Sequence, residues 1–474
     1  MQWMGWTGLA VILSGTAVAA EPEPGREAFR AIYKELVEIN TTLSVGSCTE
    51  AAEAMAAHLR EAGFPDSDLH MIVPPDRPKD GNLVAILPGS DPSAKALLLL
   101  AHIDVVEAKR EDWARDPFAL VEEDGYFYGR GTADDKAMAA VFVDSMMRYK
   151  KDGYRPKRTI KLALTCGEET PATFNGVEYL LKTNRDLIDA GMAINEGASG
   201  RLDEKGNYQF LGIQAGEKLY QDYTLEVTNK GGHSSRPVKD NAITHLAEGL
   251  ARLGAYDFPV ALNDAVRGHF ERMAKIETGE AATAMAALVA DPSDATAAAL
   301  VAKDPSRNSM MRTTCVATMV NGGHAPNALP QRVTANVNCR ILPGVTPEEI
   351  QAQLATILAD DQIRISPVPE PGPKKGTLPP LTAEVMETVE SVSSQIWPGV
   401  PLVPTMATGA TDGRFLNDAG VPTYGLSGLF ADPDGSGAHG LNERIRVQSL
   451  YEGRDFLYRV AKAFADRPSG GAGN

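Results

Sequence analysis

The chain has 474 residues, which is too long for one ordinary hydrophobic core, so we expect two domains. Its 46 basic and 62 acidic residues give a net charge of −16, and this balance argues against a nucleic-acid-binding protein, which needs a basic surface to neutralise phosphates. An apolar fraction of 43% and a charged fraction of 23% are typical of a globular, soluble protein.

Residues 1–20 have the pattern of a secretory signal peptide. An apolar run ends in the small residues Ala17-Val18-Ala19-Ala20, and the polar segment Glu21-Pro22-Glu23-Pro24 follows. The absence of Lys or Arg before the apolar run is a departure from this pattern. The run is too short to span a bilayer, and no later segment reaches the ~18 apolar residues of a membrane helix. We therefore expect a periplasmic or secreted protein, cleaved near Ala19/Ala20.

Short apolar runs, each ending at polar residues, predict the strands of a mainly parallel sheet. They cover residues 95–106, 158–169, 191–197 and 421–428. Continuous apolar runs of this length suit strands that are buried on both faces. Helical patterns accompany them, at residues 27–62, 136–151 and 177–183. This alternation of strands and helices predicts an α/β domain.

A smaller α+β domain is predicted between residues 219 and 368. The patterns indicate a strand from about Tyr220, a helix over 241–253, two strands over 311–320 and 332–342, a helix over 346–359 and a strand over 362–368. This β-α-β-β-α-β order is ferredoxin-like. An Ala-rich helical stretch at 260–303 is expected as an insertion within it. The α/β domain is then split into residues 21–218 and 369–474.

Histidines and acidic residues stand where the apolar runs meet glycine-containing turns. They are His102, Asp104, Asp134, Asp135, Glu168, Glu169, Glu196 and His439. Each has a simpler explanation when taken singly, such as a histidine paired with a neighbouring carboxylate or an Asp that caps a helix. Together they would converge on one edge of a parallel sheet, where clustered carboxylates need cations. Two histidines and three carboxylates suit two Zn²⁺ ions that share a bridging carboxylate.

The motifs AHIDVV, GRGTADDKA, CGEET, NEGAS and AHGLNE occur in an order that resembles the co-catalytic zinc exopeptidases and aminoacylases. This family includes glutamate carboxypeptidase, aminoacylase, carnosinase-type dipeptidases and succinyl-diaminopimelate desuccinylase, and the resemblance spans roughly residues 81–446. Two departures remove no ligand: Ala137 stands where glycine is commoner, and Gly167 where aspartate is usual.

The resemblance implies two zinc ions per chain and a role for each site residue. It places His102 and Glu196 on one zinc, Glu169 and His439 on the other, and Asp134 between them. It also implies that the peptide bond from Asp134 to Asp135 is cis, that Asp104 orients the ring of His102, and that Glu168 is the general base.

The resemblance extends to the smaller domain and to the second half of the α/β domain. His233 in GGHSSRP falls where the family polarises the substrate carbonyl, and Asn327 in NGGHAPNALP falls where an asparagine contacts substrate. Arg340, Gly409 and Arg414 lie in regions that the family uses to grip a substrate carboxylate. In some relatives the histidine comes from a partner subunit, so a homodimer is an open alternative.

The function that the resemblance implies is hydrolysis of an amide or peptide bond next to a free carboxylate, on small peptides or N-acyl amino acids. The enzyme is then of carboxypeptidase or aminoacylase type. A dipeptidase or aminopeptidase of the same family is the alternative within the enzymes. An exported two-domain solute-binding protein is the non-enzymatic alternative, but it has no need for the five ligand residues together.

Four cysteines are present, without the C-x-x-C spacing of a structural zinc site. Cys315 and Cys339 lie at matching distances from the turn around Asn327, so they are expected to face each other across a hairpin, either as a disulfide or as two buried thiols. We favour two thiols, because cross-strand geometry is often unfavourable for a disulfide.

Overall fold

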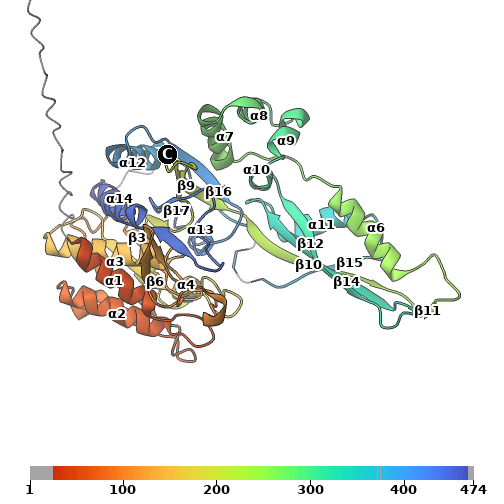
Figure 1. The fold of residues 1–474 in the computed structure, drawn as a ribbon, viewed down its shortest axis with the longest axis horizontal. Coiled ribbons are helices and arrows are strands. Elements are labelled where there is room, and N and C mark those ends of the chain that lie inside the picture. Colours follow the sequence, from red (N-terminus) through yellow and green to blue (C-terminus); the bar gives the residue numbers. More distant parts are fainter. Residues whose placement is uncertain (1–24, 371, 374, 468–474) are drawn as a thin grey trace, which may run out of the picture.

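The computed structural model describes residues 25–370, 372–373 and 375–467 (Figure 1). The described residues form a large sheet of ten strands, a smaller sheet of four, and two minor sheets of three and two strands. The signal peptide predicted over residues 1–20 lies outside the described part of the chain. Within that part, no helix combines the length and the apolar character that a membrane crossing requires.

The large sheet is mixed, with parallel strands at its centre. Its order is β1-β2-β6-β3-β7-β17-β9-β8-β18, and β16 also pairs with β9. The central strands β6, β3, β7 and β17 are parallel to one another, whereas β1 and β2 form an antiparallel margin. The bounds are β1 (Leu69–Ile72), β2 (Asn82–Leu87), β3 (Leu97–His102), β6 (Ile160–Thr165), β7 (Met192–Asn195), β8 (Gly200–Leu202), β9 (Tyr208–Glu217), β16 (Leu402–Ala407), β17 (Thr423–Gly425) and β18 (Phe430–Ala431). The predicted α/β fold with a mainly parallel sheet is confirmed.

Helices cover both faces of this sheet. One face carries α1 (Arg26–Glu38), α2 (Cys48–Glu61), α3 (Lys136–Lys151), α12 (Ala383–Ile396) and α14 (Val447–Asp466), and the other carries α4 (Gly176–Thr183), α5 (Arg185–Ile188) and α13 (Gly413–Asp418). In β3, Leu97 and Leu99 belong to the first core, whereas Leu98 and Leu100 belong to the second. Side chains alternate along a strand, so the run of four leucines reflects burial on both sides.

The single helical pattern expected over residues 27–62 is interrupted in the structure, which has α1 and α2 there. In the connection, the Asn40 side chain accepts hydrogen bonds from the N–H and the hydroxyl of Thr42. The Ser47 side chain then accepts a hydrogen bond from the first turn of α2. Local bonds of this kind compete with the helical backbone and end the first helix.

The smaller sheet has the order β12-β14-β10-β15 with antiparallel pairs throughout, which is ferredoxin-like. Its strands are β10 (Leu219–Thr228), β12 (Thr314–Gly322), β14 (Arg332–Ile341) and β15 (Arg364–Pro367). The helices α6 (Ala242–Gly254) and α11 (Pro347–Leu358) share a separate core with it. A short pair, β11 (Gly232–His233) with β13 (Ala328–Leu329), lies beyond the end of β10. The domain boundaries at 218/219 and 368/369 stay a prediction.

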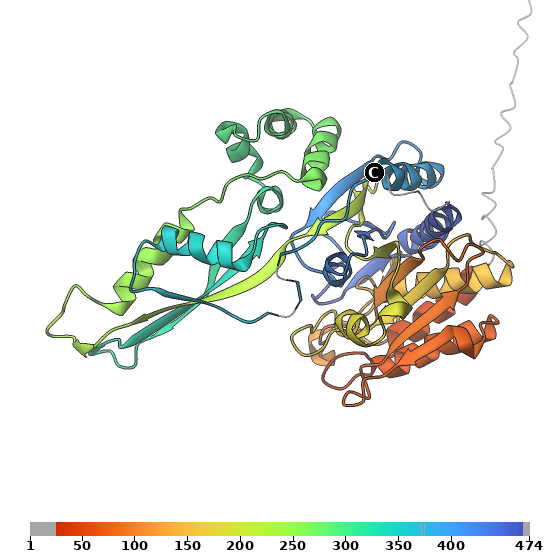
Figure 2. The same ribbon diagram turned by 180° about the vertical axis from the view of Figure 1, so that it is seen from behind.

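The Ala-rich stretch forms α7 (Asp264–Ile276), α8 (Gly279–Ala290), α9 (Ala295–Val301) and α10 (Pro305–Met311). The stretch lies between α6 and β12, as an insertion in the smaller domain would, but its helices pack on the large sheet. Val266 and Phe270 of α7 share a core with Val403 of β16, and His269 Nδ1 lies 3.1 Å from Pro404 O. Figure 2 shows α7–α9 standing beside β16, apart from the helices of the smaller sheet.

Both pairs of cysteines form disulfides. Cys315 and Cys339 are register partners on β12 and β14 and are joined, so the expectation of two buried thiols is wrong. Cys48, at the start of α2, is joined to Cys166, which follows β6. The second bond ties the amino-terminal helices to the loop that carries Glu168.

Candidate metal centre and substrate site

The predicted metal ligands meet at the carboxyl ends of the parallel strands. His102 is the last residue of β3, Glu196 follows β7, and Glu169 lies in the loop after β6. Asp134 precedes α3, and His439 comes from the loop between β18 and β19 (Arg444–Arg446). Because parallel strands end at one edge, residues separated by more than 300 positions become neighbours there.

The ring of His102 is oriented so that one nitrogen faces two carboxylates. Its Nδ1 lies 3.1 Å from the main-chain oxygen of Asp104, which can only accept a hydrogen bond, so Nδ1 carries a proton. Its Nε2 lies 3.1 Å from Asp134 Oδ1 and 3.8 Å from Glu196 Oε1. Without a cation, a proton on Nε2 would bond to Asp134. A neutral imidazole with its proton on Nδ1 would instead have its Nε2 lone pair free for a metal ion held by these carboxylates.

His439 repeats this arrangement on the other side of Asp134. Its Nε2 lies 3.1 Å from Asp134 Oδ2 and 3.0 Å from Glu169 Oε1. Each oxygen of Asp134 therefore faces a different imidazole. The carboxylate of Asp134 is common to two sets of candidate ligands, one with His102 and Glu196 and one with His439 and Glu169. The donor types and their sharing fit a pair of zinc ions bridged by Asp134. The peptide bond between Asp134 and Asp135 is cis, as the resemblance implied.

The charges of the cluster are unbalanced without a cation. Burial raises the pKa of the Glu168 and Glu196 carboxyls well above the usual range. Burial opposes ionisation of Asp134 too, but hydrogen bonds with His102 and His439 outweigh it and lower its pKa. Hydrogen bonds to Asp134 and Glu169 raise the pKa of His439 to about 10. The site thus stabilises positive charge among its carboxylates, as a metal site does.

Asp104 has a different contact from the one that the resemblance implied. Its Oδ1 lies 3.7 Å from His102 Nδ1, which is beyond a hydrogen bond. Its two carboxylate oxygens instead accept the backbone N–H groups of Glu168 and Glu169, at 3.2 and 3.1 Å. Burial raises the pKa of Asp104 to about 6. Asp104 therefore fixes the turn that presents the candidate base and one candidate ligand.

Glu443 is a functional residue that the sequence interpretation missed. Its carboxylate is fully buried and accepts the N–H groups of Ala133 and Asp134 on Oε1, at 2.8 and 3.0 Å. Its Oε2 accepts from the N–H of Gly131 and from Arg130 Nη1, at 3.0 and 2.7 Å. Glu443 therefore holds the loop of Asp134 from a position four residues after His439. Glu443 is the last residue of the motif AHGLNE, but the motif alone does not predict which groups its carboxylate binds.

Arg340, Gly409 and Arg414 come together where the smaller sheet meets the large one. Arg340 on β14 donates to the main-chain oxygen of Thr408, at 3.5 Å, and its guanidinium lies over the ring of Tyr220. The Nε of Arg414 is buried and has no hydrogen-bond partner among the described residues. Burial lowers the pKa of Arg340, and the nearby charge of Arg414 lowers it further. The two guanidinium groups therefore lie close enough for the charge of one to affect the other.

His233 and Asn327 lie together but far from the metal cluster. The Asn327 main-chain oxygen accepts the N–H of Ser234, and β11 pairs with β13 beside it. This hairpin stands at the end of the smaller sheet that points away from the large one (Figure 1). The ten residues of β10 separate the two ends by about 30 Å at the usual rise of a strand. The structure does not bring His233 to the candidate ligands of its own chain.

Comparison with known proteins decides the family. The profile described as Peptidase family M20/M25/M40 matches residues 98–463. The chain belongs to this family. It is 28% identical over 384 residues to mouse N-fatty-acyl-amino acid synthase/hydrolase PM20D1, covering 78% of this chain and 74% of that protein. It is 23% identical over 406 residues to rat aminoacylase-1A, covering 82% and 85%. The M20 protein described here is thus a hydrolase of amide or peptide bonds.

Solved structures of the family share the fold. An M20 family metallo-carboxypeptidase, Sso-CP2 from Sulfolobus solfataricus, superposes with a TM-score of 0.66 at 20% identity, over 92% of this chain and 99% of that one. Human carnosine dipeptidase 1 superposes with a TM-score of 0.59 at 16% identity, over 94% and 98%. The architecture around the cluster is therefore that of the M20 metallopeptidases.

Proposed function

We propose that this protein is a zinc-dependent hydrolase that cleaves the amide bond next to a free carboxylate, of carboxypeptidase or N-acyl-amino-acid hydrolase type. The observation that carries the proposal is the shared carboxylate of Asp134, with one imidazole and one further carboxylate on each side of it. His102, Asp134 and Glu196 would hold one ion, and Asp134, Glu169 and His439 the other.

The bound ions would supply Lewis acidity that brings the pKa of water towards ~7. Glu168 takes a proton from the attacking water, whose oxygen bonds to the carbonyl carbon. The C–N bond then breaks, and Glu168 returns the proton to the leaving amine. Burial raises the pKa of the Glu168 carboxyl, which suits a group that accepts and returns a proton. Asp104 holds Glu168 in place through its backbone N–H.

The arginine pair supports recognition of a free carboxylate on the leaving group. Charge-assisted hydrogen bonds from Arg340 and Arg414 would orient that carboxylate. At Gly409 a Cβ would meet open space, so the loop between the two arginines leaves room for a ligand. An aminopeptidase would instead need an anionic subsite for a free amine. A solute-binding protein would have no use for the five clustered ligands.

We propose a homodimer in which His233 of the partner subunit completes each site and stabilises the developing oxyanion. The distance of His233 from the cluster of its own chain supports this. So does β12, an edge strand that exposes Val316, Met319 and Val320 at 59–60% of their surface. Exposed apolar edge strands are ready to pair with another chain.

We propose export to the periplasm or beyond. The pattern of residues 1–20 supports it. The bonds Cys48–Cys166 and Cys315–Cys339 also support it, because disulfides persist in oxidising compartments.

A hydrolysis screen tests the proposal. Zinc-loaded mature protein is offered N-acyl amino acids, dipeptides, and peptides with free or amidated carboxyl termini. We expect turnover of substrates with a free carboxylate and a large loss on amidation. Full activity in a metal-free preparation, or equal rates on amidated substrates, would contradict it.

A further inference from the structure

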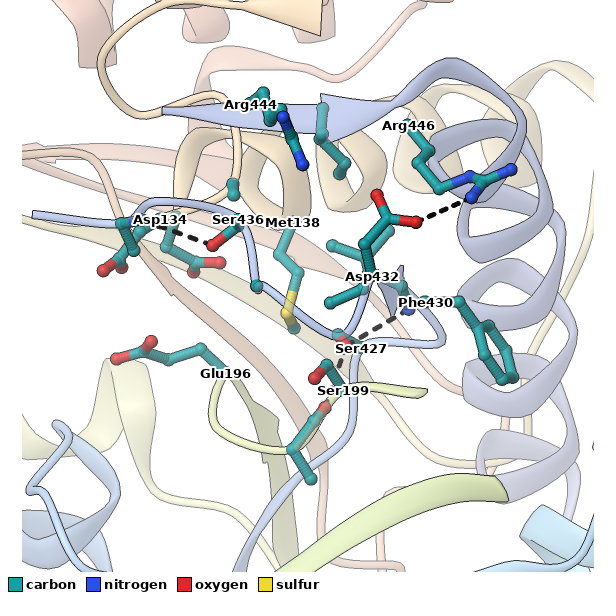
Figure 3. Close-up of a pocket in the computed structure, with 18 of the residues that line it drawn as sticks. Asp134, Met138, Glu196, Ser199, Ser427, Phe430, Asp432, Ser436, Arg444 and Arg446 are labelled. Atoms are coloured by element: carbon teal, nitrogen blue, oxygen red, sulfur yellow. Dashed lines mark hydrogen bonds and ion pairs between the residues drawn. The ribbon is translucent and has the colours of Figure 1, made fainter. Parts of the chain in front are cut away.

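A cavity of about 180 Å³ adjoins the metal cluster on the side of the large sheet (Figure 3). Asp134 and Glu196 line one of its ends, and Asp432 and Arg446 line the other, with Met138 between them. Neither Arg340 nor Arg414 is among its lining residues. The arginine pair is therefore separate from this cavity.

The wall of this cavity offers apolar surface. Met138, Leu429 and Ile445 are lining residues that are buried in the chain. The hydroxyl of Ser427 donates to Ala198 O at 2.8 Å and accepts from Leu429 N at 3.2 Å, so its polar capacity is used within the wall.

The charged side chains at the far end of the cavity form ion pairs and hydrogen bonds with other side chains of the protein. Arg446 Nη1 lies 2.7 Å from Asp432 Oδ1, and the hydroxyl of Tyr126 donates to Asp432 Oδ2 at 2.7 Å. Arg444 pairs with Asp434 at 2.8 Å. Both oxygens of Asp432 are thus occupied, so this network offers a ligand no unpaired charge.

We infer that this cavity receives the acyl side of the substrate, and that it selects a compact apolar group. The inference rests on the proposed function and names its substrate class. A substrate whose carbonyl lies at the cluster has two arms. One ends in the carboxylate that the arginines bind, so the other must leave the cluster elsewhere, and the cavity begins at Asp134 and Glu196.

The size of the cavity sets the size of the group. An apolar cavity of about 150 Å³ holds a benzene molecule, so 180 Å³ suits a phenyl ring or a chain of about six carbons. A longer acyl chain would extend past the cavity, so its additional methylene groups would add little to the binding free energy. The preferred substrates are then medium-chain or aryl N-acyl amino acids, or peptides with such a side chain before the scissile bond.

An acyl series on one amino acid tests this, with N-acetyl, N-hexanoyl, N-phenylacetyl and N-palmitoyl derivatives. Each buried methylene adds about fourfold to binding. We expect kcat/KM for the hexanoyl and phenylacetyl substrates to exceed that for the acetyl substrate at least tenfold, with no further increase for palmitoyl.

Two variants locate the effect in the cavity. Ser199 lines the cavity yet is exposed, so Ser199→Leu narrows it without disturbing the core. Ser199→Leu should lower the ratio of kcat/KM for the hexanoyl substrate to kcat/KM for the acetyl substrate about tenfold. The control Ser394→Leu, at an exposed serine on α12, should leave this ratio unchanged. Met138→Ala widens the cavity and should shift the optimum towards longer chains.

A flat acyl profile, or a profile that neither Ser199→Leu nor Met138→Ala alters, would overturn the cavity assignment while hydrolysis itself stands. If wild-type protein with zinc hydrolyses none of the four substrates and no peptide, the proposed function fails, and this inference fails with it.

Discussion

The carboxyl edge of the large sheet and the outer tip of the smaller sheet both carry predicted site residues, but they differ in what one chain assembles. At the large sheet, His102 Nε2 lies 3.1 Å from Asp134 Oδ1 and 3.8 Å from Glu196 Oε1. At the tip, Ser234 donates its N–H to the main-chain oxygen of Asn327, and His233 pairs with Ala328. These contacts include no candidate metal ligand. The difference teaches that one chain brings its candidate metal ligands together, whereas the candidate residues for substrate are divided between two distant regions of the chain.

The largest effect is expected at the large sheet, from Glu168→Gln. This change removes the proton acceptor and leaves all five candidate ligands, so kcat should fall about 10²–10⁴-fold with the metal content unchanged. Steady-state kinetics and metal analysis measure both quantities. Glu53→Gln, at an exposed glutamate on α2, is the control. A kcat within a few-fold of wild type would remove Glu168 from the role of base.

At the tip, His233→Ala should lower kcat about 10²–10³-fold, the cost of one oxyanion donor, without loss of metal. Mixing it with Glu168→Gln sharpens the comparison. Random exchange in a two-fold dimer gives half mixed dimers with one intact site each, so about a quarter of wild-type activity should return. No recovery after verified subunit exchange would place His233 in the site of its own chain.

Glu443→Gln tests how the large sheet holds Asp134. The amide cannot accept from all four donors, so zinc affinity should fall about 10–100-fold, as measured by competition with a chelator. Asp144→Asn is the matched control, because Asp144 is also buried and bonded to an arginine, Arg454, at 2.7 Å. It should lower thermal stability and leave zinc affinity unchanged. Equal zinc affinity in both variants and wild type would show that Glu443 is structural only.

The smallest effect is expected between the two regions, from Arg340→Ala. The loss of a charge-assisted hydrogen bond should raise KM about tenfold for substrates with a free carboxylate. Substrates whose carboxylate is amidated should be affected far less. A similar change in KM for both kinds of substrate would contradict recognition of a carboxylate by Arg340.

The large sheet could be predicted from sequence because its signals are local. The leucines of 97–100 indicate a strand buried on both faces, and His102 marks its carboxyl end. Once several such ends are found, the geometry of a parallel sheet brings them together. The five candidate ligands therefore followed from strand ends and from the resemblance.

The remaining features depend on contacts between distant segments. Glu443 reaches residues more than 300 positions earlier, and Cys48 joins Cys166 across 118 positions. Helix α7 has an amphipathic pattern that predicts a buried face but does not say that β16 covers it. The separation of His233 from the cluster likewise depends on the direction in which β10 leaves the large sheet.

The central claim is that one chain binds two metal ions through a shared Asp134. Calorimetric titration of metal-free wild-type protein with Zn²⁺ tests it most directly, run beside the double variant His102→Ala/His439→Ala. We predict two ions per chain for wild type and a loss of tight binding in the variant. Failure of wild type to bind zinc, or binding that is unchanged without both histidines, would contradict the account.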